Sequence, residues 1–181
     1  MNPYRTALPA TAFLILAFFA GPASAQCTID FEGTCPDATP ECGATFVGGA
    51  SCQSIGIPNC YHTGSFSYRM NQAEPVTIEL EEPIGDIVVY FVHQSSGTLG
   101  TMRFFDAATG GNEVGTPITT NGDCLSILPE RQDRSFDVGV HRIEVTVSGL
   151  GSVWIDTMTL TEFSVPVLPA RWGTVKAMYG F

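Results

Sequence analysis

The 181-residue chain has few basic residues. It contains 8 Lys and Arg against 18 Asp and Glu, which gives a formal net charge of −10 at pH 7. A surface this acidic repels phosphate backbones and anionic lipid headgroups. The composition therefore argues against nucleic acid and against a bare membrane surface as partners, and it remains compatible with neutral glycans, surface proteins and divalent cations.

The chain also lacks an apolar run long enough to span a bilayer. Its longest apolar stretch, Phe13 to Ala20, is shorter than the roughly 20 residues that a spanning helix needs. Arg5 precedes this stretch and the small residues Ala23-Ser24-Ala25 follow it, which is the pattern of a secretory signal peptide. We expect residues 1–25 to be removed, with no membrane insertion afterwards, and the protein to be secreted: extracellular, periplasmic or on the cell surface.

Motifs of catalytic sites are absent from the sequence. There is no Gly-x-Ser-x-Gly elbow, no His-Glu-x-x-His and no phosphate-binding loop. Glu79, Glu81 and Glu82 could supply the carboxylate pair of a glycoside hydrolase, but Glu79 and Glu81 lie on the outward side of one predicted strand, as solvated charge does. We therefore predict a non-catalytic protein and keep a glycan-active hydrolase as the least favoured alternative.

The six cysteines all follow the predicted cleavage site, and an even number in an exported chain indicates disulfides. Five of the six lie within residues 27–60, so we expect this segment to be cross-linked locally and tied once to the sixth. A zinc site is the competing interpretation, but there is no Cys-x-x-Cys with a histidine at ligand spacing. The predicted disulfide cysteines are Cys27, Cys35, Cys42, Cys52, Cys60 and Cys124.

Helical periodicity is missing before the last residues, whereas apolar and polar residues alternate in many short segments. About eight such segments, separated by turn residues, predict an all-β jelly-roll sandwich with a Cys-rich N-terminal loop region and a short C-terminal tail. Asp106–Asn112 and Gly149–Gly151 are predicted hairpin turns. The predicted strands are residues 28–32, 65–70, 76–81, 87–92, 101–106, 113–119, 140–148 and 152–161.

Four details of this pattern are specific enough to test. Ile87–Val92 is apolar on both faces, which predicts a central strand. Gly33–Cys60 is predicted to be loop, and so is the polar stretch Arg131–Arg134. Ser65–Met70 is expected to bury its three large apolar side chains, Phe66, Tyr68 and Met70.

The last predicted strand places a carboxylate in an apolar row. Because side chains alternate along a strand, one side of it would carry Trp154, Asp156, Met158 and Leu160. An unpaired charge there is costly. Asp156 should therefore contact a cation or a basic side chain, unless the row lies near an edge that water reaches. The basic candidates are Arg69, Arg103 and Arg142.

Acidic residues occur at both ends of the predicted domain. Asp30 and Glu32 share one side of the first strand, and Asp156 lies on the last. Calcium takes about six to eight oxygen ligands, which carboxylates and carbonyls supply. If the first and last strands are neighbours, Glu32, Asp156 and Asp30 could hold a structural calcium ion; otherwise Asp30 and Glu32 form a solvated face.

A sugar-binding site needs exposed aromatic rings beside polar groups. The aromatic candidates are Tyr61, His62, Tyr68, Tyr90 and His93. Tyr68 and Tyr90 lie within predicted strands, which favours the core or its rim. Tyr61 and His62 follow Cys60 in the loop region and are the pair placed for a ligand.

The two ends of the domain resemble known secreted modules. Asp30-Phe31-Glu32-Gly33, the segment Trp154–Leu160 and the Asp-x-x-x-Gly-Gly-Asn turn between them are similar to bacterial jelly rolls of the galactose-binding-like, carbohydrate-binding type. In those members an acid near the first strand and an Asp on the last hold a structural calcium, which implies Glu32 and Asp156 here. Thr157 departs from the Asn or Asp usual in that family.

The same residues are also similar to MAM domains. The signature of that family opens with Cys-x-Phe-Glu followed by another Cys and closes with an Ile-Asp-Asp-like strand. In this chain, Cys27 and Cys35 flank Phe31-Glu32. The resemblance covers most of residues 27–163.

Residues 164–181 differ from the domain that they follow. A Pro-containing linker leads to a tail in which Trp172, Val175 and Tyr179 would share one helical face. This tail is either a docking or sorting element or a terminal helix packed against its own sandwich.

The sequence thus predicts a signal peptide (1–25), a β-sandwich domain (26–163) and a tail (164–181). The predicted function is a secreted binding or surface-interaction module, carbohydrate-binding and with a structural calcium. The alternative is a structural protein of an envelope or extracellular matrix, without a small ligand.

Overall fold

The computed structural model describes residues 24–32, 41–48, 51–54, 64, 66–71, 75–123 and 130–164. The predicted signal peptide up to residue 23, the tail from residue 165, Tyr61, His62 and three cysteines, Cys35, Cys60 and Cys124, lie outside these residues. All the regular structure of the described part is strand, so it contains no helix that could cross a membrane.

Nine antiparallel strands make up the described part of the domain, which confirms the predicted all-β sandwich. They are β1 (Gln26–Ile29), β2 (Ala44–Val47), β3 (Ser51–Ser54), β4 (Phe66–Asn71), β5 (Val76–His93), β6 (Leu99–Phe105), β7 (Ile118–Thr119), β8 (Arg131–Ser148) and β9 (Ser152–Glu162).

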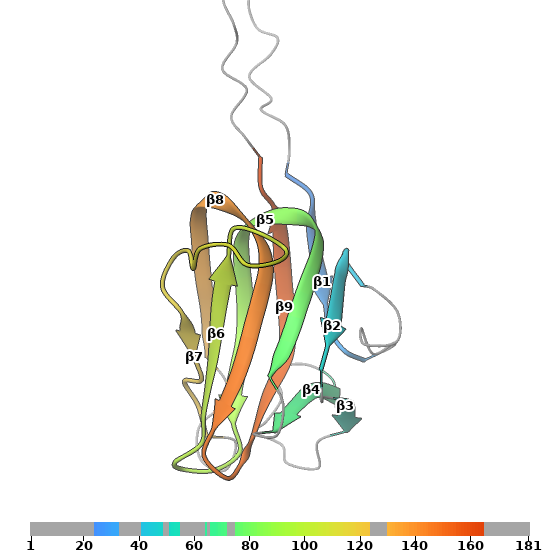
Figure 1. The fold of residues 1–181 in the computed structure, drawn as a ribbon. Helices are drawn as coiled ribbons and strands as arrows, with labels where there is room; N and C mark the ends of the chain where they lie inside the picture. The colour runs from blue at the N-terminus through green and yellow to red at the C-terminus, as the bar shows by residue number, and fades with distance from the viewer. Residues whose placement is uncertain are drawn as a thin grey trace, which may run out of the picture. The chain divides into compact units, whose positions relative to one another are not determined.

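Two long strands, β5 and β8, run through both layers of the sandwich (Figure 1). Residues 76–79 of β5 pair with 142–145 of β8, and residues 86–90 pair with 131–135, with register shifts in between. The beginning of β5 also pairs with β2, and its end pairs with β9. One layer, the β6 layer, therefore contains β7, β6, the end of β8, the beginning of β5 and β2. The other, the β9 layer, contains the beginning of β8, the end of β5, β9, β4, β3 and β1.

The bends of β5 and β8 pack directly on each other. A Cβ atom on Gly139 of β8 would stand 2.7 Å from the Cβ of Pro83 in β5, closer than two unbonded carbons can approach. Any side chain at position 139 would therefore push the two bends apart.

The core lies between the layers and receives alternate side chains from both. At one end, three aromatic rings meet. Phe46 is in β2, Tyr68 is in β4, and Phe31 comes two residues after the end of β1. Their centroids are 4.7 Å apart for Phe46 and Tyr68, 5.7 Å for Phe31 and Tyr68 and 5.8 Å for Phe31 and Phe46. All three are buried, so this cluster links β2 of the β6 layer to β1 and β4 of the β9 layer.

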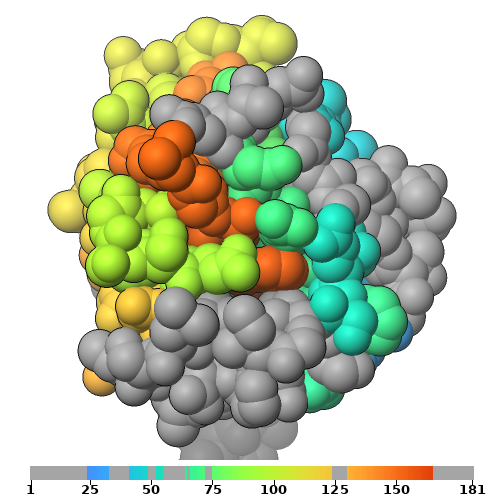
Figure 2. Space-filling model, turned by 90° about the horizontal axis from the view of Figure 1, so that it is seen from below, coloured from blue at the N-terminus to red at the C-terminus, as the bar shows by residue number. Residues whose placement is uncertain are grey.

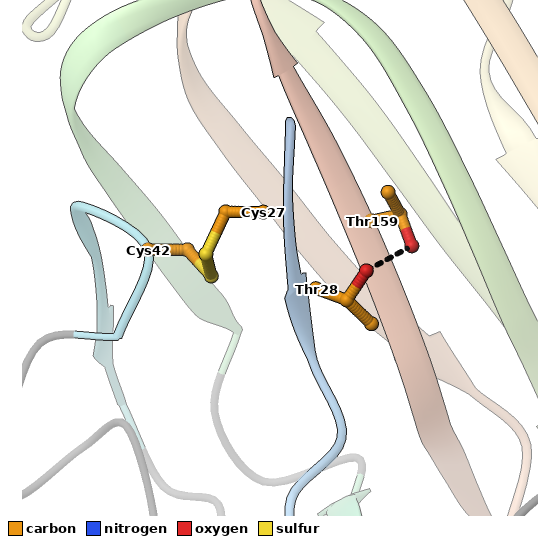
Figure 3. The surroundings of a disulfide bond; sticks show 4 residues. All are labelled: Cys27, Thr28, Cys42 and Thr159. Atoms are coloured by element: carbon orange, nitrogen blue, oxygen red, sulfur yellow. Dashed lines mark hydrogen bonds between the residues drawn. A yellow bond between two sulfur atoms is a disulfide. The ribbon is translucent and has the colours of Figure 1, made fainter. Parts of the chain in front are cut away.

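A disulfide closes the side of the sandwich next to this cluster. Cys27 in β1 is bonded to Cys42, just before β2, with a Cα–Cα distance of 5.6 Å (Figure 3). Cys52 in β3 is also disulfide-bonded. All described cysteines are thus oxidised, as predicted, and the competing zinc interpretation is wrong for them.

Polar side chains close the opposite side, where the sequence predicts a loop. Arg131–Arg134 is instead the start of β8 and pairs with residues 87–90 of β5. Gln132 donates from Nε2 to the carbonyl oxygen of Thr119 at 2.9 Å, and Arg134 donates from Nε to that of Thr116 at 3.2 Å. The stretch is polar because these side chains bind the backbone of the segment before and within β7.

Three further expectations differ from the structure. The segments 76–81 and 87–92 are one bent strand, β5, whose end is central as predicted, between β8 and β9. The predicted Gly33–Cys60 loop contains β2 and β3, because Ala44 and Phe46 alternate into the core despite the surrounding Gly and Cys. Phe66 is 38% exposed, while Tyr68 and Met70 are buried as expected.

The first strand is shorter than predicted. It ends at Ile29, and Phe31 adopts a positive φ of 60°, a left-handed conformation that ends the extended chain. Ile29 and Phe31 still both reach the core, and Asp30 and Glu32 are exposed, as the alternation predicts.

Both predicted hairpin turns are present, but the strand predicted after the first of them, 113–119, is reduced to β7 at residues 118–119. The Asp106 carboxylate accepts hydrogen bonds from the backbone N–H of Asn112 at 2.7 Å and from its side-chain amide at 3.1 Å, which lowers the pKa of Asp106. Gly149 joins β8 to β9 with a φ of 91°, and a Cβ there would overlap the carbonyl oxygen of Gly97.

Replacing Phe46 with alanine should strongly destabilise the oxidised protein. Phe46 is 2% exposed and contacts two rings, so its removal leaves a cavity, which costs about 3–5 kcal/mol. Its neighbour Val47 is 48% exposed, and Val47→Ala should change the free energy of unfolding by about 0.5 kcal/mol or less. Denaturant unfolding of both variants measures the difference; equal effects would contradict the packing of β2 against the core.

Candidate functional site

A β-bulge in β9 changes which side chains share a face. Val89 of β5 pairs with Met158, but Phe91 pairs with Ile155, so Asp156 and Thr157 together oppose Tyr90. The core-facing residues of β9 are therefore Val153, Ile155, Met158 and Leu160. Trp154 and Asp156 lie on the other side, and the prediction of one continuous row from Trp154 to Leu160 is wrong, because an extra residue reverses the alternation.

Asp156 is fully buried on this outer side of the β9 layer, at 0% exposure. Ser67 of β4 donates its hydroxyl to Oδ1 at 3.0 Å, and Thr157 donates to Oδ2 at 3.3 Å. Water at an edge is therefore not what solvates the carboxylate. These hydrogen bonds offset part of the cost of burying the carboxylate.

None of the three arginines predicted as partners forms a salt bridge with Asp156. Arg103 pairs with Glu113 at 3.9 Å, and Arg142 pairs with Glu144 at 3.2 Å. Arg69 donates from Nε to Ser152 Oγ at 2.9 Å and from Nη1 to Gln53 Oε1 at 3.0 Å. The bulge places Asp156 on the outer side of the layer, and the hydroxyl of Ser67 takes the position directly opposite it.

Glu32 lies close to the same part of β4. Its Oε1 accepts a hydrogen bond from the backbone N–H of Phe66 at 2.7 Å, next to the Ser67 that binds Asp156. Gly64 borders this carboxylate, because a Cβ on Gly64 would overlap it. Strands β1 and β9 pair, so the premise that the first and last strands are neighbours is confirmed.

Asp30 faces a different environment. Its Oδ1 accepts a hydrogen bond from the backbone N–H of Glu32 at 3.1 Å. The pKa of the Glu41 carboxyl is raised, mainly by the burial of Glu41 and in addition by the negative charge of Asp30. Within the described ranges, no three side chains of His, Cys, Asp or Glu gather closely enough to hold a metal ion. An ion bound by Glu32 and Asp156 would thus need other oxygen ligands, such as backbone carbonyls.

The outer face of the β9 layer combines an aromatic ring with polar groups. Tyr90 points outward from β5, half-exposed, and its partner in register on β8 is the exposed Arg131. On its other side lie Asp156 and Thr157. Further along the face, the hydroxyls of Thr28 and Thr159 are 2.9 Å apart (Figure 3). The sequence suggests the core or its rim for Tyr90, because this residue lies inside an apolar strand. In the structure its two neighbours, Val89 and Phe91, point into the core, so the side chain of Tyr90 points to the opposite side.

A second aromatic side chain on this face is covered. Trp154 is 4% exposed, and the guanidinium carbon of Arg69 lies 5.4 Å from its ring centroid. Its buried indole N–H has no acceptor among the residues that the structure describes. In the end view of Figure 2, orange atoms of β9 lie between the teal and green atoms of β3 and β4 and the yellow-green atoms of the β5–β6 region.

The outer face of the β6 layer has a different character. Its two arginines are ion-paired, and Arg142 also stacks on Phe105 at 4.3 Å. Arg142 donates in addition to the carbonyl oxygen of Gly110 at 2.8 Å. Glu79 and Glu81 point outward here, as predicted for solvated charge. Both arginines of this face therefore form ion pairs with glutamates of the same face.

A shallow cavity of about 290 Å³ lies where β1 approaches β2. Glu81, Glu82 and Glu162 line it together with the Cys27–Cys42 disulfide. The charged residues that line the cavity are all acidic, and none of its lining side chains is an aromatic ring or a basic group. This cavity therefore has less binding chemistry than the face around Tyr90.

No protein-family model matches the sequence, and a search of curated proteins finds no match. Among solved structures, the chain is similar to the K1 cleaved adhesin domain of Lys-gingipain from Porphyromonas gingivalis W83, with a TM-score of 0.53, 8% identity and coverage of 77% of this chain and 99% of that chain. The K2 cleaved adhesin domain of Lys-gingipain gives a TM-score of 0.51, 16% identity and coverage of 76% and 99%. TmCBM61, solved in complex with beta-1,4-galactotriose, gives 0.45, 18%, 74% and 99%. The likeness to the two adhesin domains shows a shared β-sandwich fold.

Removing the Ser67 hydroxyl should destabilise the protein through Asp156. Ser67→Ala takes a donor from a fully buried carboxylate, which costs about 1–3 kcal/mol. Ser135, on the same outer face but exposed, is the matched control, and Ser135→Ala should change the free energy of unfolding by about 0.5 kcal/mol or less. Denaturant unfolding at neutral pH compares the two. An effect of Ser67→Ala as small as that of the control would show that another group stabilises Asp156.

Proposed function

We propose that this chain is an exported, non-catalytic binding module that holds a glycan on the outer face of its β9 layer. One observation carries the proposal: the half-exposed ring of Tyr90 stands on this face among hydroxyl, carboxylate and guanidinium groups. A sugar ring packs its C–H face on an aromatic ring and exchanges hydrogen bonds at its edge. The face around Tyr90 offers both kinds of contact.

The other outer face supports this choice by contrast. Its aromatic residue, Phe105, is covered by Arg142, and its arginines are paired with glutamates. A ligand on that face would have to break these contacts before it could reach the ring of Phe105. The fold shared with two adhesin domains agrees with a surface-interaction role.

Calcium is the second part of the proposal. Glu32 and Asp156 bind adjacent residues of β4, Phe66 and Ser67, and Asp156 is a buried carboxylate hydrogen-bonded to hydroxyls. The absence of a side chain at Gly64 lets the Glu32 carboxylate lie directly against the Gly64 backbone. A calcium ion held by these two acids and by carbonyl oxygens would neutralise Asp156 and fix the end of β1 to β9 and β4. Asp30 belongs to the same predicted set.

Tyr90→Ala should abolish or strongly weaken glycan binding. Loss of a central aromatic contact costs on the order of 2 kcal/mol, so affinity should fall at least about tenfold. Phe105→Ala, on the outer face of the other layer, is the matched control and should bind as the unchanged protein does. A glycan array identifies ligands, and titration calorimetry with the best of them measures the affinities. No binding to any glycan would instead support the alternative of a structural envelope or matrix protein.

Removal of calcium should lower the melting temperature by several degrees. An ion that binds only the folded state stabilises it by mass action, by about 2.7 kcal/mol at a hundredfold excess over the dissociation constant. Asp156→Asn should remove this sensitivity to chelator, whereas Asp133→Asn, an exposed acid on the same face, should keep it. A melting curve of the unchanged protein that responds neither to chelator nor to added calcium would rule out the ion.

A further inference from the structure

The arginines of the described domain fall into two groups. Arg103 and Arg142 are ion-paired with glutamates, and the guanidinium of Arg134 donates to three backbone carbonyl groups. Arg69 and Arg131 form no salt bridge with a carboxylate of the described residues. Both lie on the outer face of the β9 layer, the face of Tyr90. In a chain with 18 acids and 8 basic residues, two arginines without such a partner on one face require an explanation.

Arg69 is fixed in position. Ser152 holds its Nε, Gln53 holds its Nη1, and its guanidinium lies over the ring of Trp154. Its Nη2 has no hydrogen-bond partner among the described residues. The side chain has therefore already lost the rotational freedom that an arginine gives up on binding, which favours recognition of a rigid planar acceptor.

Arg131 differs in being exposed and adjacent to the ring. It is the register partner of Tyr90, so the two side chains leave neighbouring strands on the same side. One carboxylate of this face, Asp156, lies opposite Tyr90, but it is fully buried and accepts hydrogen bonds from Ser67 and Thr157. The other two lie further along the strands: Asp133 is opposite Val88, and Asp86 is opposite Ser135. Arg131 is therefore the exposed charged group beside the Tyr90 ring on β8.

We infer that the ligand on this face is an acidic glycan, an oligosaccharide of uronic acid units whose carboxylates are bound by Arg69 and Arg131; this rests on the glycan-binding function proposed above. A carboxylate accepts two parallel hydrogen bonds from a guanidinium, a geometry that a neutral sugar cannot offer. The ring of Tyr90 lies on the same face and would contact the sugar itself. An acidic peptide would supply carboxylates but no sugar face to stack on that ring.

The net charge of −10 does not prevent this binding. Exposed charges further apart than about 10 Å are largely screened at 0.1 M salt. Contacts between a guanidinium and a carboxylate act at hydrogen-bond distance and are screened much less. The overall acidity should therefore slow the approach of an anionic glycan at low salt more than it weakens the bound state.

Calorimetry with two matched oligosaccharides tests the inference: an oligogalacturonate and a galactose oligosaccharide of the same length and linkage. The unchanged protein should bind the acidic ligand at least tenfold more tightly. Arg131→Gln and Arg69→Gln should each reduce binding of the acidic ligand by about tenfold and leave binding of the neutral one nearly unchanged. Arg103→Gln, in the β6 layer, should alter neither. Because Arg69 also packs on Trp154, the melting temperature of its variant is recorded, and the exposed Arg131 provides the test that does not depend on folding.

The outcomes separate the two proposals. Equal binding of both oligosaccharides, weakened by Tyr90→Ala but not by the arginine variants, would overturn the acidic specificity and keep the glycan-binding function. Binding of neither would overturn both. Equally tight binding of poly-glutamate, lost in the arginine variants, would show that the face recognises acidic chains in general and would overturn the assignment to a sugar.

Discussion

The pairing of β5 with β8 in both layers is the constraint on which the rest of the structure depends. Because the two strands pair with each other on both sides of their bends, both layers are built on the same two strands, and each half must find its remaining partners on its own side. The contact between Gly139 and Pro83 lets the bends turn together. The core is then the space enclosed between two halves of one long antiparallel ladder, closed by a disulfide on one side and by Gln132 and Arg134 on the other.

Much of this fold is predictable from residue alternation. The segments that become β4, β6, β9 and the end of β8 all show it, and both hairpin turns have the residues that their conformations need. The structure could not be predicted for segments whose residue pattern depends on partners that are distant in sequence. Arg131–Arg134 is polar because its side chains bind the backbone around β7. The strand β2 has only four residues, and its pairing with β5, which the local sequence does not reveal, keeps it in the layer.

The candidate site shows the same division. The sequence singles out Asp156 as an acid within an apolar strand, and Asp156 is buried; Glu32 and Asp156 bind adjacent residues of β4. It assigns Asp156 to the wrong row, because a single extra residue in β9 has no signature in the pattern of apolar residues. It also favours the core or its rim for Tyr90, since a strand with apolar residues on both faces does not itself indicate which side is open. Tyr61 and His62, outside the described residues, stay a prediction.

The position of β9 has a consequence for how the protein can be made. The last strand in the sequence pairs with β1, β4 and β5, so it joins the two ends and the middle of the domain. While residues after 152 are still within the ribosome, β1 lacks its partner strand and β4 can pair only with β3. The β9 layer is therefore complete only after β9 itself has emerged. A domain with this topology folds through contacts between residues that are distant in sequence, and such contacts slow folding.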